Sequence, residues 1–244
     1  MNEKVKDGDR KTWRDALFVV GIIAYFLVAF VLSAFLAQVG FFVLFGEGWS
    51  GDTVKLLSSQ VVGDVLAVVL VAVVPGKIFK GLELKKKELG VKGSVMWWDI
   101  GWAIVGFVAY MAVWVVVAMA LSEVSWFNLE ETQDLGFVGL FGVGERLVGF
   151  VALVVLVPIL EEVLFRGWMF GVLRRKMGFW GTAVLVSLAF GVMHGQMNVG
   201  VNVFIMSMVM CFLRERTGTI YSAIILHMLK NLLAFWVVFV LGRG

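Results

Sequence analysis

The sequence predicts an all-α polytopic membrane protein, a bundle of about seven transmembrane helices, and two observations predict this fold. First, 61% of the 244 residues are hydrophobic and only 16% are charged, whereas soluble domains carry about 25% charged residues. Second, the apolar residues form runs long enough for the roughly 20-residue helix that a bilayer core of about 30 Å requires. The runs are continuous rather than alternating, which argues against the strands of a membrane β-barrel.

Each expected helix corresponds to one apolar run. The seven runs are Ala16–Phe45, Leu56–Phe79, Ile100–Leu121, Leu147–Leu173, Phe179–His194, Val199–Leu213 and Thr219–Leu241. The first run is too long for the core of a signal peptide and predicts a retained anchor. Residues 177–213, which contain the fifth and sixth runs, carry no formal charge. They are too few for two helices that each cross the whole bilayer, so these two runs are short. The break at residues 195–200 therefore indicates a tight helical hairpin, one or both arms of which need not cross the whole bilayer.

Basic residues gather at alternate helix ends, which predicts the orientation of the chain. Sixteen Lys and Arg residues lie in the N-terminal segment and in the loops after the second, fourth and sixth expected helices. Only Lys55, Arg146 and Arg243 lie on the other side. The positive-inside rule therefore places the N-terminus in the cytoplasm and the C-terminus outside. We expect an integral membrane protein, most simply of a prokaryotic plasma membrane.

The lipid bilayer is the partner that the composition indicates. The formal net charge of +3 does not indicate a nucleic-acid partner, because the basic residues flank the apolar runs instead of forming one surface. The sequence indicates no oligomeric state. We expect a single membrane domain with two parts, residues 1–146 with three helices and their loops, and residues 147–241 with the remaining four.

The chemistry is expected in the second part, since the first three helices are nearly featureless. An ionisable group in hydrocarbon is costly and indicates function. Such polar residues within the expected helices are Asp64, Glu161, Glu162, Arg166, His194, His227, Lys230 and Asn231. Asp64 is predicted either to pair with Lys230 or to line a cavity, and Lys230 to extend toward the cytoplasm.

Helical spacing assigns faces to the residues of the fourth helix. Glu162 and Arg166 are four residues apart, so they share a face and can form an ion pair. Glu161 is offset from Glu162 by about 100°, which leaves it free to face a cavity. A carboxylate and an imidazole, such as Glu161 and His194, can together activate water.

The seventh helix adds a second pair. His227 and Asn231 are also four residues apart, and such a pair can donate hydrogen bonds to a developing oxyanion. These parts suit hydrolysis of an acyl bond by water. His194 lies about 15 residues along its helix, or roughly 22 Å at helical rise, and His227 only about 8 residues along its own, or roughly 12 Å. The fifth helix must therefore tilt or begin outside the hydrocarbon if the two histidines are to meet.

Three motifs in order resemble the CPBP family, also called the Abi or CAAX-protease family of intramembrane endopeptidases. Glu-Glu-x-x-x-Arg is present at residues 161–166, Phe-x-x-x-His at residues 190–194 and His-x-x-x-Asn at residues 227–231. The resemblance covers roughly residues 147–241 and implies that they form a peptidase core. It further implies cleavage near the C-terminus of lipidated, CAAX-type or membrane-anchored peptides.

The same resemblance implies a role for each motif residue. Glu161 would be the general base on water, and His194 would position that water and relay its proton. His227 and Asn231 would form the oxyanion site. The supporting residues would be Glu162, Arg166 and Phe190.

Two other interpretations stay open at this point. A zinc-dependent version of the same protease would use Glu161, His194 and His227 as metal ligands, although metal-free glutamate-type catalysis with no cofactor is favoured, because the chain lacks a His-Glu-x-x-His helix. A proton-coupled membrane carrier would use Glu161, Glu162, His194 and His227 as a relay, but inverted repeats are not evident. A scaffold without activity is disfavoured by the intact motifs.

Overall fold

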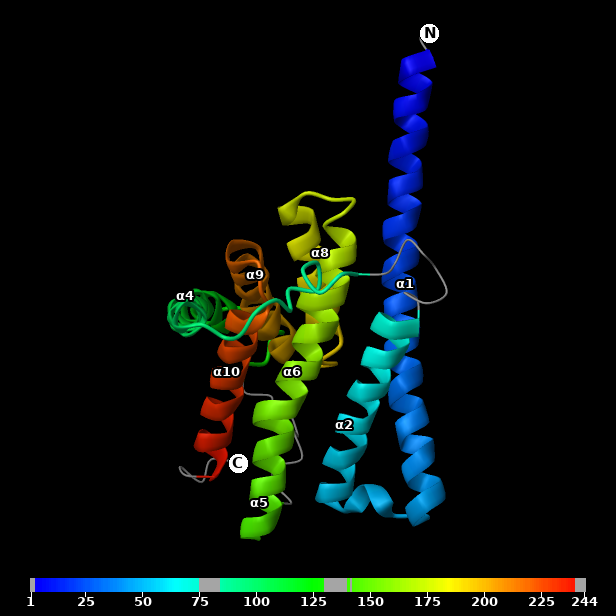
Figure 1. The fold of residues 1–244 in the computed structure, drawn as a ribbon. Helices are drawn as coiled ribbons and strands as arrows, with labels where there is room; N and C mark the ends of the chain where they lie inside the picture. The colour runs from blue at the N-terminus through cyan, green and yellow to red at the C-terminus, as the bar shows by residue number, and fades with distance from the viewer. Residues whose placement is uncertain (1–2, 75–83, 130–139, 141, 240–244) are drawn as a thin grey trace.

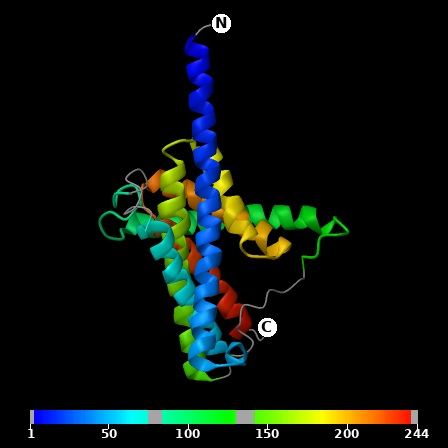
Figure 2. The same ribbon diagram turned by 90° about the vertical axis from the view of Figure 1, so that its right-hand side faces the viewer.

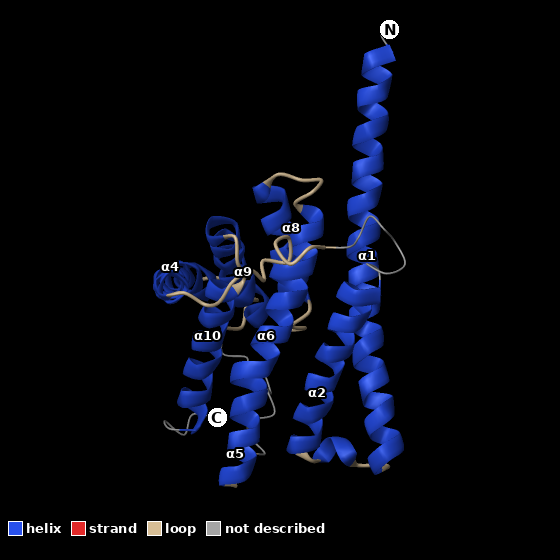
Figure 3. Ribbon diagram, viewed as in Figure 1, coloured by secondary structure: helices blue, strands red, loops and turns tan. Residues whose placement is uncertain are grey.

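The structure, a computed structural model, describes residues 3–74, 84–129, 140 and 142–239. All regular elements of this part of the chain are helices, and Figure 3 shows no strand among them. The α-helices are α1 Glu3–Phe45, α2 Thr53–Val68, α4 Trp97–Ser122, α5 Val143–Phe150, α6 Val157–Glu162, α7 Phe170–Leu173, α8 Phe179–Val192, α9 Met197–Thr217 and α10 Tyr221–Phe239. The expected all-α class is confirmed.

Within the described residues, six helical stretches are long and apolar enough to cross a membrane. They are Trp13–Phe45, Thr53–Val73, Trp97–Ser122, Val143–Leu173, Met197–Thr217 and Tyr221–Phe239. The expected fifth helix exists as α8, but its 14 residues extend only about 21 Å at helical rise. Helix α8 is therefore too short to span a core of about 30 Å upright. The predicted ends of the second and last helices, Phe79 and Leu241, lie outside the described residues.

The fourth membrane span is continuous but irregular. Helices α5, α6 and α7 are joined end to end by two π-helical stretches, Val151–Leu156 and Val163–Met169. Pro158 lies at the start of α6, and it cannot donate the hydrogen bond that an α-helix needs at that point. π-Helical turns within α-helices occur frequently at functional sites. The Glu161-Glu162 pair lies between the two π-helical stretches.

The helices are not all parallel. Figure 1 shows α1 and α2 as an antiparallel pair beside the α5–α7 span, with the start of α1 and the end of α10 at opposite ends of the molecule. Helix α4 points toward the viewer in Figure 1 and runs across the view in Figure 2, so it is steeply inclined to the other spans. Its first turn is fixed by Asp99, which accepts hydrogen bonds from Thr219 and Ser222 near the start of α10.

Helices α8 and α9 form the hairpin that the sequence predicts. Gly195 has a φ of 73°, a left-handed conformation that suits glycine, and α9 begins two residues later. The arms touch through their backbones, because a Cβ added to Gly191 would lie 2.8 Å from the carbonyl oxygen of Gly200. In Figure 2 the hairpin slants away from the upright α5–α7 span. An inclined hairpin is one of the two arrangements that the sequence predicts would let the two histidines meet.

A loop after α2 is tied to the α7 end of the α5–α7 span. The carbonyl oxygens of Glu88 and Leu89 lie against Gly171 and Gly167, which therefore accommodate this loop and not a neighbouring helix. Arg214 of α9 donates hydrogen bonds to the carbonyl oxygens of Glu88 and Arg166, at 2.7 and 3.2 Å. A hydrogen bond from the backbone N–H of Lys85 holds the pKa of the Glu88 carboxyl below its usual value, and the nearby Arg175 adds to this effect.

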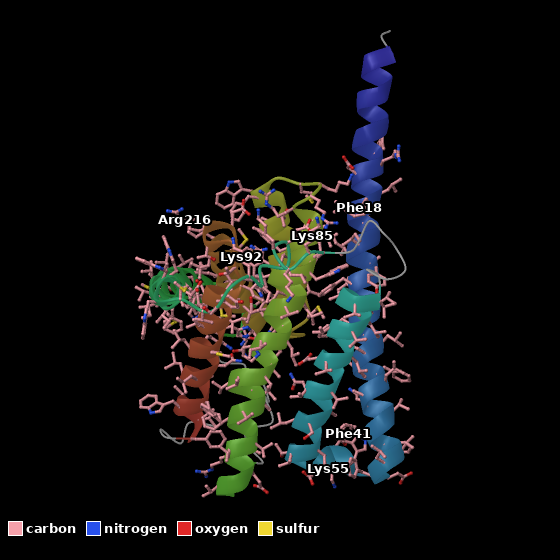
Figure 4. All side chains as sticks on the ribbon, in the orientation of Figure 1. Phe18, Phe41, Lys55, Lys85, Lys92 and Arg216 are labelled. Carbon is pink, nitrogen blue, oxygen red and sulfur yellow. The ribbon has the colours of Figure 1, made fainter. Side chains whose placement is uncertain are left out.

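Basic side chains are separated between the two ends of the molecule. Figure 4 shows Lys85, Lys92 and Arg216 in the upper half of the view and Lys55 at the opposite end. This arrangement matches the alternation along the sequence. Which end faces the cytoplasm stays a prediction of the positive-inside rule.

The contact between Gly191 and Gly200 yields a first prediction. Gly191→Ala inserts a methyl group against a backbone carbonyl, and such overpacking costs about 1–3 kcal/mol. We expect a lower free energy of unfolding, measured by denaturant titration in mixed micelles. Gly101→Ala in α4 is the matched control, since a Cβ there meets no atom within 4 Å. Equal stability of the two variants would contradict the close contact.

Candidate active site

A buried ion pair lies at the centre of the site. Arg166 Nη1 donates a hydrogen bond to Glu162 Oε1 at 2.9 Å, and both side chains have no exposed surface. The pairing predicted from the spacing is therefore present. The guanidinium carbon of Arg166 also lies 4.5 Å from the ring centre of Phe190, which adds a cation–π attraction. The pair compensates two charges that would otherwise be costly in an apolar interior.

His227 is oriented by the same carboxylate. Its Nδ1 lies 3.0 Å from Glu162 Oε1. Because Glu162 is paired with Arg166 as a carboxylate, it only accepts hydrogen bonds, and Nδ1 of His227 must carry the proton. In its neutral form the ring then carries no proton on Nε2. This nitrogen lies 3.7 Å from Glu161 Oε2, a separation suited to a shared water and longer than a direct hydrogen bond.

Phe190 connects the two histidines. The Nδ1 of His194 lies 2.8 Å from the carbonyl oxygen of Phe190 and donates to it, since a carbonyl only accepts. The ring centre of Phe190 is 4.9 Å from that of His194 and 5.8 Å from that of His227. Phe190 itself is buried. It therefore holds both imidazoles by packing, as a supporting residue would.

One cavity of about 440 Å³ brings the four candidate catalytic residues together. Residues 161, 194, 227 and 231 all line it, although they come from α6, the α8–α9 turn and α10. The side-chain amide of Asn231 donates one hydrogen bond to the carbonyl oxygen of Leu153 at 2.8 Å. This contact fixes the amide while its second N–H group can still donate.

The cavity also has a wall of which the sequence predicted only Asp64 as a possible lining residue. The expectation that the first three helices would be featureless is wrong for α1 and α2. Their polar side chains line the cavity opposite the motif residues, as Ser33, Gln38, Ser59, Gln60 and Asp64. The available signal was the spacing of Gln60 and Asp64, which are four residues apart and share a helical face.

Asp64 and Lys230 both line the cavity, but they do not form the predicted ion pair. No described carboxylate lies within ion-pair distance of the Lys230 ammonium group, and Oδ2 of Asp64 is buried without a hydrogen-bond partner. Lys230 is partly buried and lines the cavity. Its charge is attracted by Glu161 at longer range.

The described residues do not fit a zinc site. A catalytic zinc usually takes three protein ligands and a water. Among the residues that the structure describes, no group of three His, Cys, Asp or Glu side chains converges closely enough to hold a metal ion. Glu161, His194 and His227 share the cavity without forming such a group.

Comparison with known proteins relates this part of the chain to membrane peptidases. Residues 143–233 match the family model described as type II CAAX prenyl endopeptidase Rce1-like. The resemblance to the CPBP family is confirmed. These matched residues, the Rce1-like segment, contain all three motifs. The chain is also 26% identical over 218 residues, 85% of each chain, to the "Putative membrane peptidase YdiL" of Bacillus subtilis (strain 168). No solved structure matches it.

The ion pair of the Rce1-like segment yields a second prediction. Arg166→Gln leaves Glu162 buried without its counter-charge, and breaking such a pair costs about 3–5 kcal/mol. We expect the double variant with Glu162→Gln to be more stable than Arg166→Gln alone, because it removes the unpaired charge. The measurement is the free energy of unfolding in mixed micelles.

The exposed pair between Arg174 and Glu215 provides the control for this experiment. Its two atoms are 2.8 Å apart, but each side chain is about one-third exposed. We expect Glu215→Gln to cost less than about 1 kcal/mol. A similar loss for Glu215→Gln and Arg166→Gln would mean that burial does not distinguish the two pairs.

Proposed function

We propose that this protein is an intramembrane endopeptidase that hydrolyses a peptide bond near the C-terminus of lipidated or membrane-associated peptides. The observation that carries the proposal is the single cavity in which a carboxylate, two imidazoles and an amide meet within a membrane helix bundle. Membership of a peptidase family supports the reaction class. The substrate and the role of each residue are inferences from the chemistry of the site.

The first step would be attack by a water held between Glu161 and His227. Nε2 of His227 and Oε2 of Glu161 are 3.7 Å apart, so one water can hydrogen-bond to both. Glu161 takes a proton from the water as its oxygen bonds to the carbonyl carbon. His227 orients the water through its unprotonated Nε2, because Glu162 holds the proton on Nδ1.

This assignment changes the role that the family resemblance implies for His227. A ring whose proton lies on Nδ1 cannot donate from Nε2 to an oxyanion, but it can accept from water. The oxyanion donors would instead be the second N–H of Asn231 and the ammonium group of Lys230. Lys230 is three residues after His227 on α10 and lines the same cavity, so its charge can stabilise the negative oxygen.

The second step would break the carbon–nitrogen bond. Glu161 returns its proton to the departing amine nitrogen as the oxyanion collapses, and the products are a carboxylate and an amine. His194 faces the water from the α8–α9 turn, with its Nδ1 anchored on the Phe190 carbonyl. It would position the water and relay its proton, as the resemblance implies.

Loss of the base yields a third prediction. Glu161→Gln and His227→Ala should each lower kcat/KM by about 10²–10⁴-fold, the usual contribution of general acid–base catalysis. The measurement is cleavage of a quenched-fluorescent prenylated C-terminal peptide by the purified protein in detergent. Glu47→Gln, a change of an exposed carboxylate outside the cavity lining, is the control and should cleave like the wild type. Full activity of Glu161→Gln would remove Glu161 from the mechanism.

A fourth prediction concerns metal. Because the described donors do not converge on a three-ligand site, we expect the same assay to keep its activity with a strong zinc chelator. The control is a known zinc peptidase treated in parallel, which should lose activity. Loss of activity in this protein, restored by added zinc, would assign a metallopeptidase mechanism to the same residues.

A further inference from the structure

The wall formed by α1 and α2 presents hydrogen-bond acceptors to the cavity. Asp64 is 5% exposed, and its Oδ2 has no partner. The hydroxyls of Ser33 and Ser59 donate to the carbonyl oxygens of their own helices, at 2.6 and 2.7 Å. Their oxygens can therefore only accept from a group in the cavity. The amide oxygen of Gln60, one helical turn from Asp64, adds another acceptor.

The charges around the cavity point to the same ligand chemistry. Apart from the two histidines, its ionisable lining residues are Asp64, Glu161 and Lys230. Lys230 forms no ion pair with Asp64, and the buried Oδ2 of Asp64 has no hydrogen-bond partner. A carboxylate without a counter-charge is costly within a membrane bundle. A ligand that brings a positive charge to Asp64 would supply this counter-charge.

We propose that Asp64 and Gln60 form a subsite for a basic side chain, Lys or Arg, of the substrate. The inference rests on the proposed peptidase function only in naming a peptide as the ligand. A protonated Lys or Arg side chain carries several donors and no acceptor, which complements a wall that offers acceptors. The subsite lies outside the Rce1-like segment, on a helix that carries none of the three motifs. Asp64 would thus select substrates without taking part in bond cleavage.

The test measures binding separately from cleavage. The full-length Glu161→Gln protein in detergent is titrated with N-acetylated fluorescent peptides that differ only by Lys or Gln at one position, scanned along the peptide. Acetylation removes the terminal amine as an alternative cation. We expect Lys to lower Kd by at least about ten-fold at one position, as hydrogen bonds to a charged group do.

Asp64→Asn in the same background keeps the size of the side chain and removes its charge. It should abolish the preference for Lys and leave the Kd of the Gln peptide unchanged, which also shows that the protein is folded. Ser58→Ala is the control on the same helix, since the Ser58 hydroxyl bonds only to the Val54 carbonyl oxygen at 2.7 Å. It should keep the preference.

Two results would overturn the subsite: no preference for Lys at any position, or a preference that persists in Asp64→Asn. Cleavage of the same peptides by the wild-type protein is measured in parallel. Binding that prefers Lys without any cleavage would keep the subsite and overturn the proposed hydrolysis. Cleavage of peptides that bind with no preference for Lys would keep the proposed hydrolysis and overturn the subsite.

Discussion

The buried pair of Glu162 and Arg166 is the interaction on which the rest of the site depends. One oxygen of Glu162 accepts from both Arg166 and His227, so the same carboxylate neutralises a guanidinium and sets the proton on an imidazole. Arg166 lies over Phe190, which packs against both histidines. Its backbone carbonyl accepts from Arg214, which also binds the loop after α2. The charges at one turn of the α5–α7 span thus orient side chains on α8, α9 and α10.

A hydrolase within a bilayer must also keep water where hydrocarbon would exclude it. The cavity meets this requirement because its polar lining comes from every side, with acceptors on α1 and α2 and ionisable groups on α6 and α10. The short, inclined α8 brings His194 to the same cavity as His227. The close backbone contact of Gly191 with Gly200 holds that turn in place. Packing of small residues, which drives helix association in membranes, therefore has a direct effect on the chemistry.

Much of this arrangement could be predicted from the sequence. There are physical reasons why the remainder could not be predicted. Long apolar runs give the helix positions, and a spacing of four residues gives the pair of Glu162 and Arg166. Spacing along one helix cannot show which residue of another helix faces it, so the contact of His227 with Glu162 was not predicted. Hydropathy does not encode tilt, which left the geometry of α8 open. Isolated polar residues such as Asp64 give little signal, because their partners are far away in the chain.

The cavity joins two parts of the chain that contribute different properties. The residues assigned to bond cleavage lie within the Rce1-like segment at positions 143–233, whereas the opposite wall comes from α1 and α2. Substitutions in α1 and α2 can alter the shape and charge of that wall while the ion pair and both imidazoles keep their contacts. A protein built in this way can acquire new targets during evolution at little risk to its reaction. An exchange of α1 and α2 between relatives would be a practical route to redirect it.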